Sequence, residues 1–485
     1  MEQSPKSLKT YIADITKEKF DHMNEGQIEE LITLLGSECV LLDKESIHEH
    51  SFDTWPVSVK WKNQGKQIFP PDVVVRPRNT QQVSALLKWA TENKVPVTPW
   101  GGGSSVTGQP LALKGGISLD MSAMDKIISL NDKSLVVKVQ AGKFGDKLEE
   151  ELNQKGYTLN HSPQSLDRST VGGWLSTRAM GQFSSRYGGM EDLMICFSVV
   201  LPTGELVETM NVPRGDVGPD LRHIFMGAEG TLGVITEATL KIFPLPVFQK
   251  FETVTFDNVE AGVNVMRNIM RKDIRPFLVR FYDEIESHHA MQDKSFKKCV
   301  MFLGFQGVEA IAMAEYDAVI DLCKAEGGEL LGPAATEAWM GRRYDFSTVE
   351  NLLDEKGGLA ETIEIAHFWD QILDTYYELK EACTPYADEV FSHFSHIYPQ
   401  GTSLYIILLG KDSDDATAEA NLLKVWDIVM RICLKNGAAI SHHHGAGLAR
   451  GPYIADSLGS SMQVLHRIKK EFDPAGIMNP GKLGN

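Results

Sequence analysis

The chain has 485 residues, of which 42% are hydrophobic and 23% charged, and its formal net charge is −17 at pH 7. This length exceeds what one hydrophobic core usually organises, and the composition is that of a globular protein, so we expect at least two domains and exclude a disordered chain. An acidic excess of this size repels a phosphodiester backbone, which argues against nucleic acid as a partner.

The first 68 residues are expected to form an N-terminal helical segment. Its opening stretch lacks the apolar core of a signal peptide, and no run of about 20 apolar residues occurs anywhere, so we expect a cytoplasmic protein. Four apolar residues recur at helical spacing and form one stripe: Leu8, Tyr11, Ile12 and Ile15. We favour a helix docked on its own protein, while peripheral contact with a membrane surface stays open as the alternative.

Residues 69–246 are expected to form a first domain that begins with a βαβ unit. The pattern predicts a strand in 69–79, a helix at 80–94 and a strand at 95–100 that ends in a glycine-rich loop. Short β-like stretches follow at 115–122, 133–142, 194–208 and 231–246. The domain is therefore mainly β-structure after its opening unit.

Residues 247–415 mix strands with helices and are expected to form a second domain. Strands are predicted at 277–285, 298–307 and 403–410, and helices at 259–272 and 308–326. This mixture indicates an antiparallel sheet covered by helices, which would cap a substrate. Residues 416–485 are expected to form a C-terminal helical segment.

The six cysteines lie far apart in the sequence: Cys39, Cys196, Cys299, Cys323, Cys383 and Cys433. No Cys-x-x-Cys pair is present that would hold zinc, an iron–sulfur cluster or a redox disulfide. We expect buried, reduced thiols in a reducing compartment.

A glycine-rich loop follows the strand predicted at 95–100. Residues 99–108, with the sequence PWGGGSSVTG, combine glycines with hydroxyl side chains. Glycine lets bare backbone N–H groups approach a phosphate that any Cβ would hold away. The loop has neither G-x-G-x-x-G nor G-x-x-x-x-G-K-[ST], which argues against a Rossmann or P-loop site. Because such loops are also common surface turns, this loop alone leaves both interpretations open.

Two further segments place glycines among hydroxyl groups. Residues 165–178 have the sequence SLDRSTVGGWLSTR, and residues 225–236 have FMGAEGTLGVIT. With the loop at 99–108, and in the same order, they resemble the FAD-binding domain of the vanillyl-alcohol-oxidase type, also called FAD-linked oxidases. The resemblance implies an α+β protein with a PCMH-type FAD-binding domain, an antiparallel-sheet cap domain and a C-terminal helical segment that returns to the flavin.

The resemblance also implies which residues bind FAD. The first loop would cradle the pyrophosphate, the second segment would border the phosphates and the isoalloxazine, and the third would contact the cofactor through its backbone. The residues concerned are Pro99, Gly101, Gly102, Gly103, Ser104, Ser105, Gly108, Gln109, Ser165, Thr170, Gly172, Gly173, Ser176, Thr177, Glu229, Gly230, Val234 and Ile235. Some members attach flavin covalently through a His in the first loop or a Cys in the second segment. Ser104 stands at that His position here and the second segment has no Cys, so we predict non-covalent FAD.

Three adjacent histidines, His442, His443 and His444, stand in one loop near the C-terminus. A solvated loop, a metal site completed by His393 and His396, and a set of catalytic imidazoles are three interpretations. Consecutive loop residues cannot easily all reach one ion, and no carboxylate motif accompanies them. We therefore predict catalytic histidines and no metal.

The surroundings of this loop distinguish two branches of the family. The hydroxy-acid dehydrogenase branch usually has a Glu-His-Gly turn here and a metal-binding His pair upstream. In this chain His443 stands in place of the Glu, and Leu404 and Tyr405 stand where the second upstream His would be. Residues 169–178, the Ser-His-Ile-Tyr run at 395–398 and the triple His instead resemble the alkylglycerone-phosphate synthase branch.

That branch converts an acyl-glycerone phosphate and a fatty alcohol into an alkyl-glycerone phosphate and a fatty acid, with the flavin as a covalent handle. Such chemistry needs a proton carrier, a phosphate anchor and an apolar tunnel. The resemblance implies that His443 or His444 moves the proton, that Tyr405 assists on the flavin side and that Arg280 binds an anionic group. An ion pair of Arg280 with Asp283 is an equal alternative. We further expect a small-molecule or lipid substrate and a homodimer.

One departure from the synthase branch keeps a second function open. The branch normally has an active-site Arg-Asp before a segment that ends in Glu-Thr, but Val349 and Glu350 stand there when Glu361 is aligned with that Glu. Arg342 or Arg343 would replace the arginine only after a shift of register. The alternative is an FAD-linked oxidoreductase that takes hydride from a 2-hydroxy acid or alcohol onto flavin N5. A non-catalytic flavin-binding regulator is disfavoured by the His, Tyr and Arg candidates.

Overall fold

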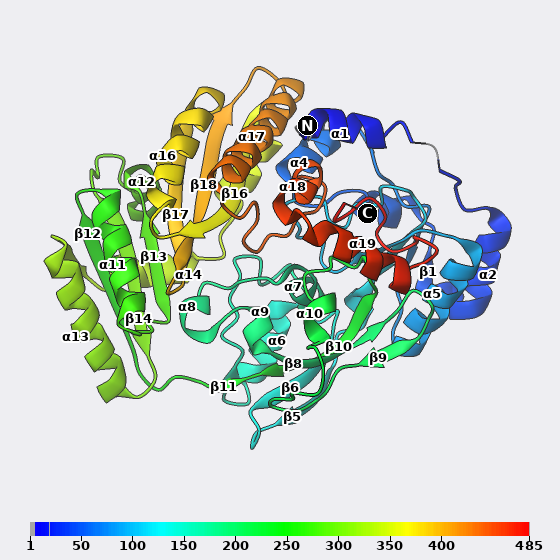
Figure 1. Ribbon diagram of the computed structural model, residues 1–485, viewed down its shortest axis with the longest axis horizontal. Helices are drawn as coiled ribbons and strands as arrows, with labels where there is room; N and C mark the ends of the chain where they lie inside the picture. The colour runs from blue at the N-terminus through cyan, green and yellow to red at the C-terminus, as the bar shows by residue number, and fades with distance from the viewer. Residues whose placement is uncertain (1–4, 19, 485) are drawn as a thin grey trace.

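The computed structural model describes residues 5–18 and 20–484. Its strands form sheets of four, five and seven strands and a two-stranded ribbon, which Figure 1 shows with the helices packed around them. Helices and largely antiparallel sheets are thus combined in one chain, and the predicted α+β class is confirmed.

The N-terminal segment is helical and packed on the protein. It contains α1 (Leu8–Ile15), α2 (Glu25–Leu35), α3 (Lys44–Glu49) and α4 (Pro56–Asn63). In α1 the side chains of Leu8 and Ile12 are buried, and the N–H of Leu8 donates to Asp427 in α17 (Asp415–Asn436) at 2.8 Å. The apolar stripe predicted here is packed against the chain itself, as favoured, and is not presented to a membrane.

The first sheet delivers the glycine-rich loop. Its order is β1-β2-β4-β3, in which β2, β4 and β3 are parallel and β1 is antiparallel: β1 (Val40–Leu41), β2 (Val73–Val75), β3 (Val97–Trp100) and β4 (Ile117–Asp120). Helix α5 (Thr80–Asn93) connects β2 to β3, which confirms the predicted βαβ unit. The Asn79 side chain caps this helix by accepting the N–H of Gln82 at 2.9 Å. Because β3 ends at Trp100, residues 101–108 begin at the edge of a buried sheet.

The second sheet is antiparallel and carries the other two glycine segments. Its order is β5-β6-β10-β8-β9: β5 (Ile127–Asn131), β6 (Val136–Gln140), β8 (Met194–Val200), β9 (Leu206–Glu208) and β10 (Val234–Lys241). Its helices are α6 (Gly145–Asn153), α7 (Val171–Thr177), α8 (Ser184–Tyr187), α9 (Met190–Leu193) and α10 (Arg222–Phe225), and β7 (Tyr157–Thr158) pairs with β11 (Phe243–Pro244). The N–H of Glu229 donates to the carbonyl of Ser176 at 2.9 Å, so the second and third segments lie side by side.

The third sheet has seven antiparallel strands in the order β15-β12-β14-β13-β17-β18-β16: β12 (Gln249–Phe256), β13 (Leu278–Tyr282), β14 (Cys299–Gln306), β15 (Glu329–Gly332), β16 (Gly358–Phe368), β17 (Glu389–Ile397) and β18 (Gly401–Lys411). The accompanying helices are α11 (Val259–Arg271), α12 (Glu284–Met291), α13 (Glu309–Ala325), α14 (Ala334–Arg342), α15 (Ser347–Asp354) and α16 (Ile372–Cys383). Helices α11, α13, α16 and α17 lie along one face of this sheet in Figure 1 and bury its largest apolar cluster. The predicted helix-covered antiparallel sheet is confirmed.

Strands β12, β15, β16 and β17 were not predicted. In β16 the charged residues Glu361 and Glu364 interrupt the apolar run, yet both are buried. Trp426 Nε1 donates to Glu361 Oε2 at 2.7 Å, and Arg450 pairs with Glu364. A strand whose acids are satisfied by distant partners cannot be recognised from local hydropathy.

The C-terminal segment, with α18 (Ile454–Leu458) and α19 (Ser461–Phe472), returns to the first sheet. The N–H of Val97 donates to the carbonyl of Ile477, and the N–H of Asn479 donates to the carbonyl of Val97, both at 2.8 Å. The end of the chain therefore lies beside β3, close to the start of the glycine-rich loop.

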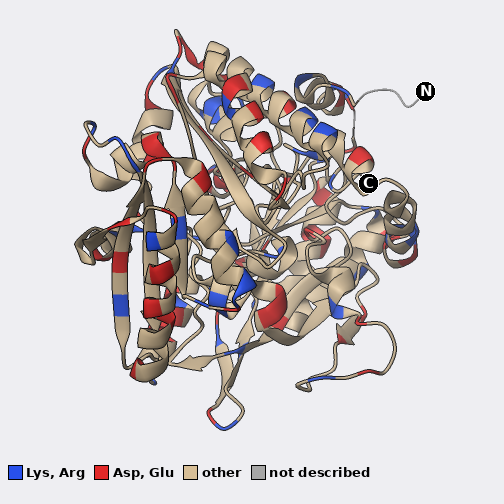
Figure 2. Ribbon diagram, turned by 60° about the vertical axis from the view of Figure 1, so that its left-hand side comes forward, with Lys and Arg blue, Asp and Glu red and all other residues tan. Residues whose placement is uncertain are grey.

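All six cysteine side chains are buried and free, as expected. Figure 2 shows residues of both charge signs interspersed over the outer helices, so the net charge is not gathered on one element. Within residues 5–18 and 20–484, no helix combines the length and hydropathy that crossing a membrane requires.

Candidate active site

A cavity of about 840 Å³ lies where the three sheets meet the C-terminal loop. Its wall includes every residue predicted for FAD binding except Gly108, and every predicted catalytic residue except His442. The N–H of Gly108 donates to the buried carboxylate of Asp53 at 2.8 Å. His442 lies directly behind the wall, hydrogen-bonded to His443. Residues scattered over more than three hundred sequence positions are thus brought to one place.

The glycine-rich loop forms a backbone cradle. A Cβ added to Gly101 would lie 2.5 Å from Thr170 Oγ1, and one added to Gly102 would lie 2.1 Å from the carbonyl oxygen of Arg168. Gly103 has φ +66°, which L side chains rarely adopt. Among the described residues, none accepts a hydrogen bond from the backbone N–H groups at 102–106. Unsatisfied N–H groups in a concave loop fit the pyrophosphate of FAD.

The three glycine segments also contact one another. A Cβ on Gly230 would lie 2.7 Å from Pro99 Cγ, so this contact requires glycine. Glu229 next to it accepts the N–H groups of Ala446 at 2.5 Å and Gly447 at 2.9 Å. Burial raises the pKa of Glu229 above its ordinary value, although the hydrogen bonds from these two backbone amides partly offset the increase. Glu229 therefore joins the third glycine segment to the histidine loop.

Glu364 on β16 organises the histidine loop. Its Oε1 accepts the N–H groups of His442 at 3.1 Å, His443 at 3.0 Å and His444 at 2.7 Å. Its Oε2 pairs with the guanidinium of Arg450, and both side chains are fully buried. Burial alone would raise the pKa of Glu364, but Arg450 and the loop amides lower it to about 2. One carboxylate thus binds three consecutive backbone amides and fixes the conformation of the loop that carries the histidines.

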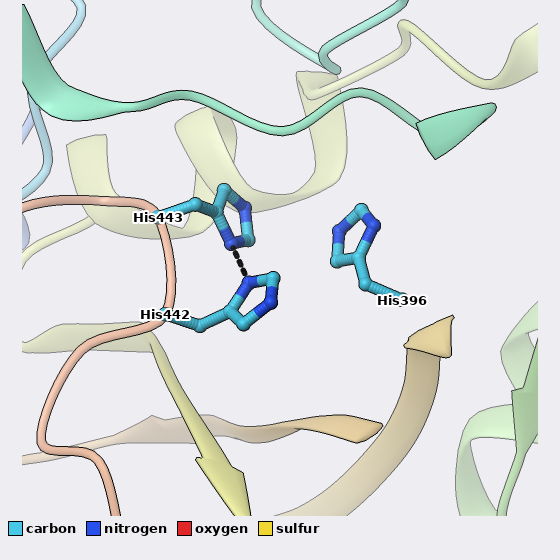
Figure 3. Close-up of side chains that lie close together, drawn as sticks. All are labelled: His396, His442 and His443. Atoms are coloured by element: carbon cyan, nitrogen blue, oxygen red, sulfur yellow. Dashed lines mark hydrogen bonds between the residues drawn. The ribbon is translucent and has the colours of Figure 1, made fainter. Parts of the chain in front are cut away.

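Two tyrosines bracket the first two imidazoles of the loop. Tyr405 Oη is 2.7 Å from His443 Nε2, and Tyr398 Oη is 2.7 Å from His442 Nε2. The two Nδ1 atoms of His442 and His443 are hydrogen-bonded at 2.7 Å, as Figure 3 shows. Burial lowers the pKa of His442 to about 4 and that of His443 well below its ordinary value. Both imidazoles are therefore neutral at pH 7.

A third imidazole, His396, lies beside this pair in Figure 3, and the three nitrogens are within 4.8 Å of one another. His396 Nδ1 is 2.8 Å from Ser184 Oγ. Two ligands of a tetrahedral zinc, bound at 2.0–2.1 Å, lie about 3.3 Å apart. The shorter Nδ1–Nδ1 separation of His442 and His443 favours a hydrogen bond between them over shared coordination.

Arg280 on β13 is fixed by two neighbours. Its Nε donates to Tyr282 Oη at 2.7 Å and its Nη2 to His393 Nε2 at 2.8 Å. His393 then donates from Nδ1 to Glu286, 2.8 Å away. In the part of the chain that the structure describes, Nη1 has no such partner, and Arg280 lines the cavity. The alternative of an ion pair with Asp283 is not realised, since Asp283 pairs with Lys380 at 2.6 Å.

Neither candidate for the missing arginine reaches the cavity. Arg342 donates to the carbonyl of Ala290, and Arg343 stacks on Tyr344. The cavity wall near α15 instead includes Glu350, which pairs with Arg168 at 2.5 Å. Arg280 is thus the buried cation in this wall, and its Nη1 keeps a free donor among the described residues.

Glu364, Arg450 and Glu286 belong to the surroundings of the site but were not predicted from the sequence. The signal that marks them is a charged residue inside an otherwise apolar segment, such as Glu364 within β16. Such a residue needs a buried partner, but the sequence does not say which one.

Comparison with known proteins shows two matching families. Residues 71–210 match the FAD binding domain, and residues 245–483 match the C-terminal domain of FAD linked oxidases.

Three relatives and one solved structure illustrate the range of similar proteins. The uncharacterized FAD-linked oxidoreductase YgcU of Escherichia coli K12 is 30% identical over 480 residues, which cover 94% of this chain and 97% of that protein. The alkyldihydroxyacetonephosphate synthase of Caenorhabditis elegans is 30% identical, covering 87% and 77%. The D-lactate dehydrogenase of Anaerostipes hadrus is 29% identical, covering 85% and 89%. A solved alkyldihydroxyacetonephosphate synthase superimposes with a TM-score of 0.79 at 25% identity, covering 99% and 88%.

The glycine segments that converge on one cradle and these full-length similarities lead to the same conclusion. The chain belongs to the FAD-linked oxidases of the vanillyl-alcohol-oxidase type and is an FAD-dependent enzyme.

Proposed function

We propose that this enzyme carries out a reaction of the alkylglycerone-phosphate synthase type, in which a fatty alcohol replaces the acyl group of an acyl-glycerone phosphate. The observation that carries the proposal is the pairing of Tyr405 with His443 in the cavity wall, 2.7 Å apart. The dehydrogenase branch usually has a histidine of a metal-binding pair and the Glu of a Glu-His-Gly turn at these two places. Similarity to synthases over most of the chain supports it.

The roles of the side chains follow from their positions. Burial raises the pKa of Tyr405 and lowers that of His443, so both groups are neutral, and their 2.7 Å hydrogen bond lets Tyr405 exchange a proton with His443 in the same step as it gives one to, or takes one from, the reacting carbon of the substrate. His444 lines the same wall, and its buried Nδ1 lies 3.9 Å from Glu364 Oε2. Its Nε2 has no hydrogen-bond partner within residues 5–18 and 20–484, and we assign this nitrogen to a substrate oxygen.

The free Nη1 of Arg280 provides the anion anchor. A guanidinium held by Tyr282 and His393 keeps its orientation, so its remaining donors bind a phosphate without a further loss of side-chain freedom. The glycine cradle would hold FAD, whose flavin ring would supply the covalent handle of this chemistry. A cavity of about 840 Å³ is near the upper end of the roughly 300–1,000 Å³ typical of ligand sites.

The test is anaerobic flavin absorbance of the holoenzyme mixed with palmitoyl-glycerone phosphate. We expect loss of the oxidised-flavin band with release of palmitate, and recovery of the band on addition of hexadecanol without any electron acceptor. No change of the flavin band and no palmitate release would exclude the synthase reaction.

A second function, oxidation of a 2-hydroxy acid, is favoured by one observation. Because Arg342 and Arg343 are turned away and Glu350 occupies the wall, the anchor is a single arginine, which suffices for a carboxylate. Arg280 would then bind the carboxylate, and His443 would take the hydroxyl proton. Full flavin reduction by a hydroxy acid such as D-lactate, reversed by an added dye, would establish this function instead.

A further inference from the structure

The hydrogen bonds of Tyr405 continue beyond the cavity to His442 and Tyr398, which have no part in the proposed function. Tyr405 and His443 line the cavity, while His442 and Tyr398 lie outside its wall. Tyr398 is partly exposed and begins the turn at 398–400 between β17 and β18, whose next two residues are exposed. Three bonds of 2.7 Å each thus connect the cavity to the surface of the protein.

The bonds of this chain must all run in one direction. A neutral imidazole has one N–H donor and one acceptor nitrogen, and here both nitrogens of His442 and of His443 are used. If Tyr398 donates to His442, then His442 donates from Nδ1 to His443, and His443 donates from Nε2 to Tyr405. The hydroxyl proton of Tyr405 is then free to point into the cavity. In the reversed state every bond runs outward.

We propose that Tyr398, His442, His443 and Tyr405 form a proton relay between the substrate and solvent. When Tyr405 gives its proton to the substrate, it takes one from His443 Nε2, His443 takes one at Nδ1 from His442, and His442 takes one at Nε2 from Tyr398. Tyr398 is reprotonated by water. One proton moves inward, every group ends neutral, and no oxidant or reductant is consumed. Removal of a substrate proton runs the same steps in reverse.

Within this relay Tyr398 and His442 are positioning residues, since they act on the substrate only through His443 and Tyr405. The phenol of Tyr398 remains protonated, because burial and then the carboxylates of Glu191 and Asp192 raise its pKa. Tyr398 is therefore neutral before and after each transfer. The relay would let Tyr405 exchange protons with solvent without water entering the cavity.

The relay rests on the proposed function in one step only, the exchange of a proton between Tyr405 and the substrate. It is therefore tested in two parts, one with substrate and one without. The variant is Tyr398→Phe, which breaks the outer end without altering the cavity wall. The matched control is Tyr316→Phe, because Tyr316 donates one comparable bond, to Glu252 at 2.8 Å, far from the cavity. Both variants are studied as the FAD-loaded enzyme.

The kinetic part uses palmitoyl-glycerone phosphate with hexadecanol, or D-lactate with a dye, whichever the wild type turns over. General acid–base catalysis contributes roughly 10²–10⁴-fold, so loss of the outer end should lower kcat by about 10- to 100-fold. KM and the flavin spectrum should be unchanged, and the solvent deuterium isotope effect on kcat should increase. Equal kcat and equal isotope effects for Tyr398→Phe and Tyr316→Phe would overturn the relay.

The spectroscopic part needs no substrate and separates failure of the relay from failure of the proposed function. In holoenzyme labelled with ¹⁵N-histidine, and assigned with His442→Gln, Tyr398→Phe should shift the ring nitrogens of both His442 and His443, because one change of direction reorients every bond. A response confined to His442 would show uncoupled groups and overturn the relay, even if both substrates react. Shifts of the ring nitrogens of both histidines would support the relay even if neither substrate reacts.

Discussion

Replacing Glu364 by glutamine removes the charge that holds the histidine loop. The carboxylate accepts three consecutive loop amides and pairs with Arg450, and neither side chain is exposed. Breaking a buried ion pair by neutralising one partner typically costs about 3–5 kcal/mol, because the other charge is left uncompensated. The lowering of the Glu364 pKa from 4.5 to about 2 means that the fold favours its charged form by about 3 kcal/mol, which agrees with this cost. We expect Glu364→Gln to destabilise the protein by about 3–5 kcal/mol.

Urea unfolding followed by tryptophan fluorescence measures this loss. The matched control is Glu252→Gln, because Glu252 is also buried but accepts hydrogen bonds from the neutral groups Tyr316 Oη and Thr253 N–H. The control should lose only about 1 kcal/mol. Adding Arg450→Met to Glu364→Gln should recover part of the stability, because no unpaired charge then remains. If Glu364→Gln were no worse than Glu252→Gln, the assignment of this ion pair as the support of the loop would be wrong.

The same pair predicts a pH dependence of stability. The folded-state pKa of Glu364 lies below its ordinary value of 4.5, so its contribution is fully present above pH 4.5 and is lost as the pH falls towards about 2. Between these limits the wild type should lose stability more steeply than Glu364→Gln, which has no carboxylate to protonate there. Parallel curves in urea titrations from pH 5 to pH 3 would contradict this prediction.

Three further predictions concern the cofactor and the anion anchor. Gly102→Ala should weaken FAD binding at least tenfold in a fluorescence titration, because the added Cβ would lie 2.1 Å from a carbonyl oxygen. The control Gly341→Ala, whose added Cβ meets nothing within 4 Å, should bind FAD like the wild type. Acid precipitation of the holoenzyme should leave the yellow colour in the supernatant, since Ser104 stands at the position of covalent attachment; a yellow pellet would show a covalent bond. Arg280→Met should lower kcat/KM for an anionic substrate by about 10- to 100-fold, as expected for about 1.5–3 kcal/mol from a charged hydrogen bond; an unchanged kcat/KM would remove Arg280 from the substrate site.

Several elements of the fold follow from local patterns. The apolar spacing of α5 and its Asn79 cap predict a helix, and the apolar run of β14 predicts a strand, because in both cases the neighbouring residues decide the conformation. Local patterns do not predict strands β16 and β17, because their buried Glu and His side chains are stabilised by groups far away in the sequence. The docking of α1 on α17 was favoured from its apolar stripe, but its site was not predictable.

By itself the sequence determined which segments are candidates for the chemistry: three glycine segments that resemble a flavin site, a triple-histidine loop, Tyr405 and Arg280. These assignments depend on residue types and short spacings, which are local. Only the tertiary structure decided which groups touch. Glu364 binds the loop amides, Arg280 is turned into the cavity by Tyr282 and His393, and Arg342 and Arg343 are kept out of it. The physical reason is that a buried charge or hydrogen-bonding group must find a partner, and in this fold the partner lies on another strand or loop.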